Sequence, residues 1–377
     1  MAAQFRRRPS AGSRPQLIMF APVETPVPPE KARLCDELLS APRRPVFVLG
    51  RNKYAERVAR QVIVEGFIDD FTSDSTYLGR PITRMNELPK EALVVSCVVE
   101  GRPLTALERL RTAGQPTAID YFLLTRIAPS QFEPIDFCAR NQEDILANAS
   151  RYVALQERLA DETSRCMFGQ VVQFRLTMDV DYMRGFSMAV DRQYFEDFLP
   201  LVADEVFVDG GGYDGTTTLE FAARNPGYKR IHYFEPSSTM MKRSKERLGA
   251  LRDLAFHQQG LGDQCARLRF DDSAGAASHV SPNGGTEIDV VRLDDAVPEL
   301  VSLVKLDIEG AECAALQGAA RHIGKDKPKL AVCVYHDQSD FWRVPELVLG
   351  MNDRYQIFFR HYSEGVFETV MFFVPKP

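Results

Sequence analysis

A glycine-rich segment, followed by a strand that ends in a carboxylate, constrains the fold of this chain more than any other feature. Residues 206–215 read VFVDGGGYDG, which predicts a buried strand that runs into a tight turn. A helix is expected next, and the strand at 231–234 then delivers Glu235 at its carboxyl end. In an open parallel sheet nucleotides bind at that edge, where an acidic side chain accepts hydrogen bonds from ribose hydroxyls. The sequence therefore predicts a site for a cofactor that contains a nucleoside.

The glycine spacing alone leaves two classes of cofactor open. Gly210, Gly212 and Gly215 satisfy the spacing of the dinucleotide fingerprint, so an NAD(P)-dependent oxidoreductase acting on a sugar nucleotide is one alternative. Asp209 and Asp214, however, place carboxylates at the strand end and in the loop, where a pyrophosphate would be repelled. An acidic loop favours a ligand with positive charge, such as the sulfonium and ammonium groups of S-adenosylmethionine.

Composition narrows the class of protein. A chain of 377 residues with 45% hydrophobic and 26% charged residues is expected to form two or three globular domains. The net charge of −6 argues against a nucleic-acid partner, and no apolar run approaches the roughly 20 residues of a membrane span. Seven dispersed cysteines favour reduced thiols and a cytoplasmic location. No prediction of the oligomeric state follows from the sequence.

Alternating strand and helix patterns predict an α/β protein with two Rossmann-like parts. The predicted organisation is a disordered leader with a short helix (1–41), a smaller Rossmann-like domain (42–140), a helical connector (141–200) and a larger Rossmann-like domain (201–377). The first turn of the smaller domain, residues 50–54, has one glycine where a dinucleotide site would have three. We therefore predict that the smaller domain binds no dinucleotide.

The end of the chain distinguishes between classes of parallel sheet. Two strands are expected at 356–360 and 370–374, joined by the turn sequence Tyr-Ser-Glu-Gly at 362–365. Such a turn favours an antiparallel hairpin. A parallel sheet that is completed by a C-terminal antiparallel hairpin is the topology expected of class I methyltransferases. An ordinary dinucleotide domain does not usually end in this way.

A second segment carries candidate catalytic groups. The sequence KLDIEGAE at 305–312 predicts a buried strand that presents Asp307, Glu309 and Glu312 before a helix, and His336 ends the next strand. Asp307 and His336 are therefore candidates for a general base, although such residues also cap helices or bind backbone groups. Clustered carboxylates more often cap helices or face solvent than bind a cation, so no metal site is predicted.

Together these segments resemble the FkbM family of methyltransferases. The resemblance is carried, in the family's order, by VFVDGGGYDG (206–215), YFEP (233–236), LGD (261–263), RLDD (292–295) and KLDIEGAE (305–312). It implies methylation of a hydroxyl, commonly on a sugar or polyketide, with S-adenosylmethionine as cofactor. By position, the resemblance implies that Asp209, Gly210 and Gly212 form the loop on the methionine side. It also implies that Glu235 holds the ribose and that Asp263 lies near the adenine.

The sequence thus predicts an S-adenosylmethionine-dependent O-methyltransferase whose acceptor is a hydroxyl of a small molecule or glycan. Two alternatives belong to other classes of function. One is the oxidoreductase that the glycine spacing permits. The other is a methyltransferase-like domain that binds cofactor as a non-catalytic scaffold.

Overall fold

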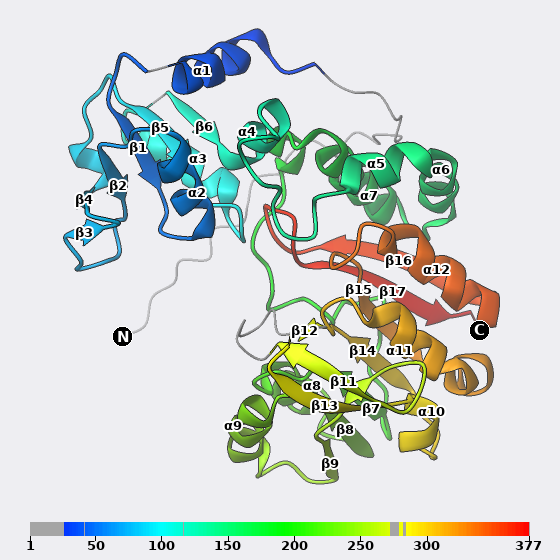
Figure 1. Cartoon of the computed structure of the whole chain (residues 1–377). Coiled ribbons are helices and arrows are strands. Elements are labelled where there is room, and N and C mark those ends of the chain that lie inside the picture. The colour runs from blue at the N-terminus through cyan, green and yellow to red at the C-terminus, as the bar shows by residue number, and fades with distance from the viewer. Residues whose placement is uncertain (1–25, 41, 116, 272–278, 282–283, 377) are drawn as a thin grey trace, which may run out of the picture.

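Three β-sheets organise the chain in the computed structural model, which describes residues 26–40, 42–115, 117–271, 279–281 and 284–376. A smaller sheet belongs to the N-terminal part and a larger one to the C-terminal part, and a group of helices lies beside the larger sheet (Figure 1). The third sheet is short and lies next to the larger one. Most of the predicted leader falls outside the described residues.

The N-terminal sheet has a Rossmann-like strand order. Its order is β3 (Thr76–Tyr77), β4 (Arg80–Thr83), β2 (Gly66–Ile68), β1 (Val46–Leu49), β5 (Leu93–Ser96) and β6 (Ala118–Asp120). All neighbours pair in parallel except β3 with β4. The helices are α1 (Pro29–Leu39), α2 (Lys53–Gln61), α3 (Pro103–Thr112) and α4 (Tyr121–Ile127), with a short 3₁₀ turn at Met85–Glu87. Every residue of β5 is buried, as expected for a central parallel strand covered on both faces.

A helical connector follows and packs against the edge strand of the larger sheet. It contains α5 (Asn141–Ala147), α6 (Ala149–Arg158), α7 (Glu162–Thr177) and a 3₁₀ turn at Val180–Met183. Asp161 caps α7 by accepting a hydrogen bond from the backbone N–H of Ser164 at 2.6 Å. Phe168 of α7 packs edge-on against Phe359 of β16 (Tyr355–His361), with ring centroids 5.2 Å apart. Burying an aromatic ring of this kind contributes about 1.5–3 kcal/mol to stability, so α7 is firmly held on the hairpin.

The C-terminal sheet confirms the predicted class I methyltransferase topology. Its order is β16, β17 (Thr369–Pro375), β15 (Lys329–Cys333), β14 (Leu303–Leu306), β7 (Val206–Gly210), β8 (Arg230–Phe234) and β9 (Leu254–His257). Strand β17 is antiparallel to both of its neighbours, whereas the pairs from β15 to β9 are parallel. The accompanying helices are α8 (Thr216–Arg224), α9 (Ser238–Leu248), α10 (Leu293–Ala296), α11 (Glu312–Gly318) and α12 (Asp340–Met351), with a π-helical turn at His322–Asp326. The C-terminal hairpin is therefore present as the turn sequence predicted.

The third sheet lies beside the carboxyl edge of the larger one (Figure 1). Its order is β10 (Gly260–Leu261), β13 (Thr286–Val291), β11 (Ala266–Asp271) and β12 (His279–Val280). Ile288 and Val290 of β13 are buried with Phe270 of β11, so the sheet has a small apolar core of its own. This sheet supplies one wall of the cavity described below.

The turn of the C-terminal hairpin also contacts the N-terminal part. The carboxylate of Glu364 accepts hydrogen bonds from the backbone N–H of Thr105 at 2.7 Å and from its hydroxyl at 2.5 Å. These bonds satisfy an otherwise free N–H group at the start of α3, where no side chain of the helix's own N-cap residue does so. The hairpin thus links the two parts of the molecule.

Among the residues that the structure describes, no helix combines the length and the apolar character that crossing a bilayer requires.

Candidate active site

A cavity of about 450 Å³ lies at the carboxyl ends of β7, β8 and β14. Its walls come from the glycine turn after β7, the strand end at Glu235, the segment after β14 and the third sheet. This is the edge at which parallel α/β sheets bind ligands. The fold therefore brings the two motifs of the sequence, 206–215 and 305–312, to one site.

The glycines of the turn are required by close packing. A Cβ atom on Gly211, which has a φ of +72°, would lie 1.9 Å from the carbonyl oxygen of Asp307. A Cβ atom on Gly212 would lie 2.0 Å from the ring of Tyr233. Gly211 and Tyr213 line the cavity, whereas Gly210 and Gly212 pack against the sheet beneath it. The turn is thus pressed against β14 and β8 and presents backbone to the cavity.

The two carboxylates of the glycine loop point away from the cavity. Asp209 is fully buried, accepts a hydrogen bond from the Thr218 hydroxyl at 2.7 Å and forms an ion pair with Lys305 at 3.1 Å. Asp214 lies at the surface and pairs with Arg247 at 2.6 Å. Neither carboxylate lines the cavity, so its acidic character comes from other residues.

Five carboxylates line the cavity, and none of the described lining residues is a lysine or an arginine. The five are Glu235, Asp263, Asp307, Glu309 and Glu368. Their summed field favours a ligand with positive charge over one with phosphates. Apolar side chains of the third sheet, including Leu268, Ile288 and Val290, form the opposite wall.

Glu235 and Asp263, for which the resemblance implies contacts with the cofactor, both line the cavity. The Glu235 carboxylate accepts hydrogen bonds from the backbone N–H groups of Tyr213 at 2.9 Å and Ser237 at 2.8 Å. Burial raises the pKa of Glu235 to about 7, although these two hydrogen bonds act to lower it. Asp263 follows Gly262 in the turn after β10 and is exposed at the cavity. Both carboxylates are thus accessible to a ligand in the cavity.

Asp307 lies at the end of β14 and lines the cavity. The hydroxyl of Tyr194 donates to its Oδ2 at 2.8 Å, and the hydroxyl of Tyr335 donates to its Oδ1 at 3.3 Å. Burial would raise the pKa of Asp307, but Lys305, His336 and the Tyr194 hydroxyl together hold it below its ordinary value. Asp307 is therefore an ionised carboxylate that faces the cavity.

His336 is close to Asp307 but does not line the cavity. Its side chain is fully buried, and its Nδ1 lies 2.9 Å from Oε1 of Glu312. Burial alone would lower the pKa of His336, but the charge and hydrogen bond of Glu312, together with Asp307 and Glu309, raise it to about 10. A histidine in this state keeps its proton near neutral pH.

Several residues of the site were not predicted from sequence as catalytic or binding residues. Tyr194 comes from the segment before β7, Tyr335 follows β15, and Glu368 comes from the C-terminal hairpin. Glu309 was considered only as part of an acidic run. It lines the cavity with a φ of +55°, and burial, opposed by His336, raises its pKa to about 7. A positive φ and a carboxylate that titrates near neutral pH are signals that only the folded chain reveals.

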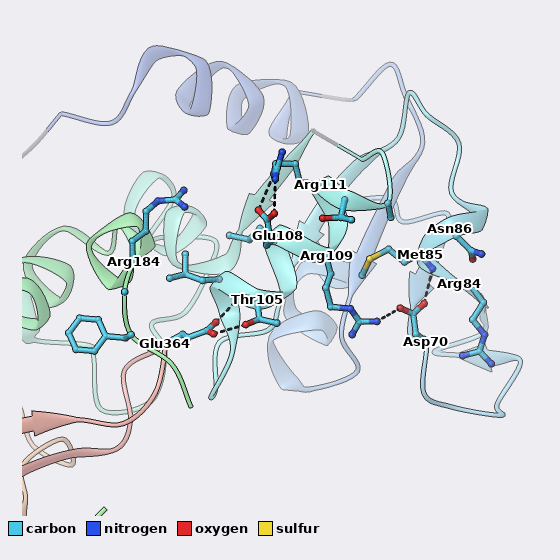
Figure 2. Close-up of a pocket in the computed structure, with 16 residues that line it drawn as sticks. Asp70, Arg84, Met85, Asn86, Thr105, Glu108, Arg109, Arg111, Arg184 and Glu364 are labelled. Atoms are coloured by element: carbon cyan, nitrogen blue, oxygen red, sulfur yellow. Dashed lines mark hydrogen bonds and ion pairs between the residues drawn. The ribbon is translucent and has the colours of Figure 1, made fainter. Parts of the chain in front are cut away.

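A second cavity of about 970 Å³ lies in the N-terminal part, along α3 (Figure 2). Although it is larger, none of the residues of either motif lines it. Figure 2 shows Arg109 directed at Asp70 and Arg111 at Glu108, and these pairs are 2.7 Å and 2.6 Å apart. Arg184 pairs with Asp181, and Arg84 donates to the backbone carbonyls of Asp69 and Thr72. Because its basic side chains already have partners within the protein, this cavity is a weaker candidate for ligand chemistry than the smaller one.

The C-terminal part matches a known family model. Residues 209–362 match the model of the methyltransferase FkbM domain, which confirms the resemblance that the sequence motifs carry. No curated protein matches the chain.

Comparison with solved structures extends the likeness in fold to the N-terminal part. The crystal structure of the methyltransferase FkbM from Methylobacillus flagellatus KT is similar to this chain, with a TM-score of 0.75 and 24% sequence identity. The similarity covers 92% of this chain and 94% of that one. An rRNA methylase from Streptococcus thermophilus is 16% identical over 46% of this chain and 89% of that one, with a TM-score of 0.32. Aeropyrum pernix fibrillarin, in complex with S-adenosyl-L-methionine, is 14% identical over 49% and 72%, with a TM-score of 0.33.

Proposed function

We propose that this chain, a methyltransferase with an FkbM domain at residues 209–362, transfers a methyl group from S-adenosylmethionine to a hydroxyl of a sugar, glycan or polyketide-like acceptor. The observation that carries the choice of cofactor is the charge of the cavity, which has five carboxylates and no lysine or arginine among its described lining residues. A sulfonium and an ammonium group are attracted to such a site, whereas the pyrophosphate of a dinucleotide is repelled.

The cofactor's nucleoside is proposed to lie between Glu235 and the third sheet. Glu235 is held by two backbone N–H groups and keeps lone pairs for the ribose hydroxyls. Asp263 is proposed to accept a hydrogen bond from the adenine amino group. The apolar side chains of Leu261 and Val290, which line the same wall, suit the adenine ring.

Asp209, Gly210 and Gly212 are proposed to shape the methionine side of the site from beneath. Lys305, paired with Asp209, donates hydrogen bonds from Nζ to the carbonyl oxygens of Gly210 at 3.1 Å and Gly211 at 2.7 Å. The backbone of the turn is thereby fixed against the sheet. Its cavity-facing side, at Gly211 and Tyr213, is then available to the methionine group.

The reaction is an in-line displacement at the methyl carbon. The acceptor oxygen forms a bond to this carbon while the carbon–sulfur bond breaks, and the electron pair of that bond stays on sulfur as S-adenosylhomocysteine forms. The hydroxyl proton passes to Asp307, which is the proposed base because it is ionised and lines the cavity. Alignment of oxygen, carbon and sulfur supplies the rest of the rate enhancement.

His336 is proposed to act through Asp307 rather than on the substrate. It is buried behind the cavity, its Nε2 lies 3.6 Å from Oδ1 of Asp307, and its raised pKa makes it a poor base. Its positive charge keeps Asp307 ionised and oriented. Replacing it would therefore change the behaviour of Asp307 without removing a direct contact with substrate.

The cysteines support a proposed location in the cytoplasm. All seven are free, and Cys265 is exposed. Exposed free thiols persist in a reducing compartment, whereas in secreted proteins they are usually paired.

Methyl transfer from S-adenosylmethionine carrying a labelled methyl group, offered with a panel of glycan and polyketide hydroxyl acceptors, tests the proposed function. We expect label in at least one hydroxyl acceptor and release of S-adenosylhomocysteine. Cofactor binding without transfer to any acceptor would favour the non-catalytic scaffold. Oxidation of a sugar nucleotide with NAD(P) would favour the oxidoreductase.

A further inference from the structure

Four charged side chains gather where the cavity meets the buried end of β15. They are Asp307, Glu309, Glu312 and His336, here called the acidic cluster. Asp307 and Glu309 face the cavity, while Glu312 and His336 are buried behind them. Atoms of Asp307, Glu312 and His336 that are able to bind a metal lie within 4.8 Å of one another, whereas Glu309 lies outside this group and approaches it through His336. Three carboxylates around one imidazole leave an excess of negative charge.

Glu312 fixes the orientation of the imidazole. Its Oε1 accepts hydrogen bonds from the backbone N–H of Ile308 at 2.9 Å and from Nδ1 of His336 at 2.9 Å, and its Oε2 accepts from the N–H of Gly310 at 3.0 Å. These contacts engage both oxygens of the Glu312 carboxylate. The ring nitrogen that remains for another ligand is therefore Nε2.

The Nε2 atom of His336 has no hydrogen-bond partner, although the side chain is fully buried. Buried polar atoms without a partner are uncommon in folded proteins and call for an explanation. Nε2 lies 3.6 Å from Oδ1 of Asp307 and 3.5 Å from Oε2 of Glu309. Neighbouring ligand atoms of an octahedral cation, each about 2.1 Å from the ion, lie about 3.0 Å apart, so both carboxylates would have to move toward Nε2 to share an ion with it.

We propose that the acidic cluster binds a divalent metal ion through Nε2 of His336 and the carboxylates of Asp307 and Glu309. The ion would displace the proton of Nε2 to solvent, and its charge would take the place of the imidazolium charge beside Asp307. Glu312, on the other side of the ring, completes the carboxylate–histidine–metal arrangement that orients ligating histidines. One imidazole and two carboxylates suit a first-row transition ion such as Mn²⁺ better than an all-oxygen ion such as Mg²⁺. Asp307 and Glu309 are partly exposed, so their side chains have room to close on the ion.

The metal ion would act at the acceptor end of the site, and this role rests on the proposed function. A hydroxyl bound to a divalent cation would be more acidic than a free one and would give up its proton more readily. Oδ1 of Asp307 faces the ion, while Oδ2, which accepts from Tyr194, keeps a second lone pair for the hydroxyl proton. The bonds made and broken at carbon and sulfur are the same as without the ion.

Titration of the EDTA-treated full-length protein with Mn²⁺, followed by electron paramagnetic resonance of free Mn²⁺, tests the proposal. We expect one bound ion per chain and at least about tenfold weaker binding in Glu309→Gln, which removes a partly exposed ligand. His336→Gln should weaken binding similarly. Asp263→Asn is the matched control, because it neutralises an exposed carboxylate of the same cavity outside the cluster and should leave Mn²⁺ affinity unchanged.

Absence of Mn²⁺ binding to the wild-type protein, or wild-type affinity in Glu309→Gln, would overturn the metal site. Calorimetry with S-adenosylhomocysteine separates this failure from failure of the proposed function. Binding of S-adenosylhomocysteine without any binding of Mn²⁺ would refute the metal site alone. Binding of Mn²⁺ without S-adenosylhomocysteine would leave the metal site standing and refute the proposed cofactor.

Discussion

The two larger sheets of this protein share a Rossmann-like arrangement of parallel strands but differ at the turn after their first strand. In the C-terminal sheet, Gly211 and Gly212 follow β7 and leave a backbone-lined cavity. In the N-terminal sheet, Gly50 follows β1, and the next residues carry side chains. Asn52 caps α2 through its oxygen and donates from Nδ2 to the carbonyl of Cys97 at 2.9 Å. The corresponding crevice is thus crossed by the protein's own side chain.

The carboxylates that follow the second strand of each sheet also differ in whether they can contact a ligand. Glu235 at the end of β8 is held by backbone N–H groups and faces the cavity. After β2, Asp69 is paired with Arg51 at 2.8 Å and Asp70 with Arg109 at 2.7 Å. A carboxylate that is engaged by arginine has little capacity left for a ribose hydroxyl. Strand order thus provides a possible site, while a few side chains at the turns decide whether a ligand fits.

The largest expected effect comes from the base. Asp307→Asn should lower kcat by about 10²–10⁴-fold with little change in affinity for S-adenosylhomocysteine, because it removes proton transfer and keeps the shape of the side chain. The matched control is Asp69→Asn, at a strand end of the N-terminal sheet, which should leave kcat unchanged. Steady-state kinetics and calorimetry measure both quantities. Full turnover in Asp307→Asn would exclude it as the base.

The glycine turn gives the next largest effect. Gly211→Ala places a Cβ atom 1.9 Å from the Asp307 carbonyl, so the turn must move, and we expect a loss of about 3 kcal/mol, or about 100-fold, in affinity for S-adenosylhomocysteine. Gly50→Ala meets no atom closer than 3.7 Å. It should lower stability by about 1–2 kcal/mol because of its φ of +108°, without changing cofactor affinity. If both variants weakened cofactor binding equally, the proposal that only the C-terminal sheet binds the cofactor would be refuted.

Replacing Glu235, the carboxylate at the end of β8, is expected to have a smaller effect on cofactor affinity. Glu235→Ala should weaken binding of S-adenosylhomocysteine by about 1–3 kcal/mol, since it removes a charged acceptor for ribose. Asp70→Ala, its counterpart after β2, should leave this affinity unchanged. Calorimetry on both variants makes the comparison. Unchanged affinity in Glu235→Ala would refute the ribose role.

The smallest expected effect is a pH dependence of cofactor binding. Glu235 has a pKa raised to about 7, so it is mostly protonated at pH 6 and mostly ionised at pH 8. The ionised form accepts both ribose hydroxyls, and affinity for S-adenosylhomocysteine should therefore rise about tenfold between these values. Calorimetric titrations at several pH values measure the rise. If the affinity of Glu235→Gln for S-adenosylhomocysteine rose as steeply with pH, another group would be the cause of the dependence.

The sequence was most informative where a motif is local. The glycine turn, Glu235 and Asp307 each follow a strand, and their positions in the fold agree with what strand–turn patterns predict. Asp209 shows where such reasoning is incomplete, because its burial depends on Lys305, which is 96 positions away in the chain. Tyr194 reaches Asp307 across a separation of 113 residues, and Glu368 enters the cavity from the C-terminal hairpin. Contacts of this kind depend on tertiary packing and have no local sequence pattern.

The central claim is that one cavity, in the C-terminal part, binds S-adenosylmethionine, and that neither sheet binds a dinucleotide. Calorimetric titration of the full-length protein with S-adenosylhomocysteine, and separately with NADH, tests this claim most directly. We expect one S-adenosylhomocysteine bound per chain, binding about 100-fold weaker in Gly211→Ala, and no binding of NADH. Binding of NADH without binding of S-adenosylhomocysteine would contradict it.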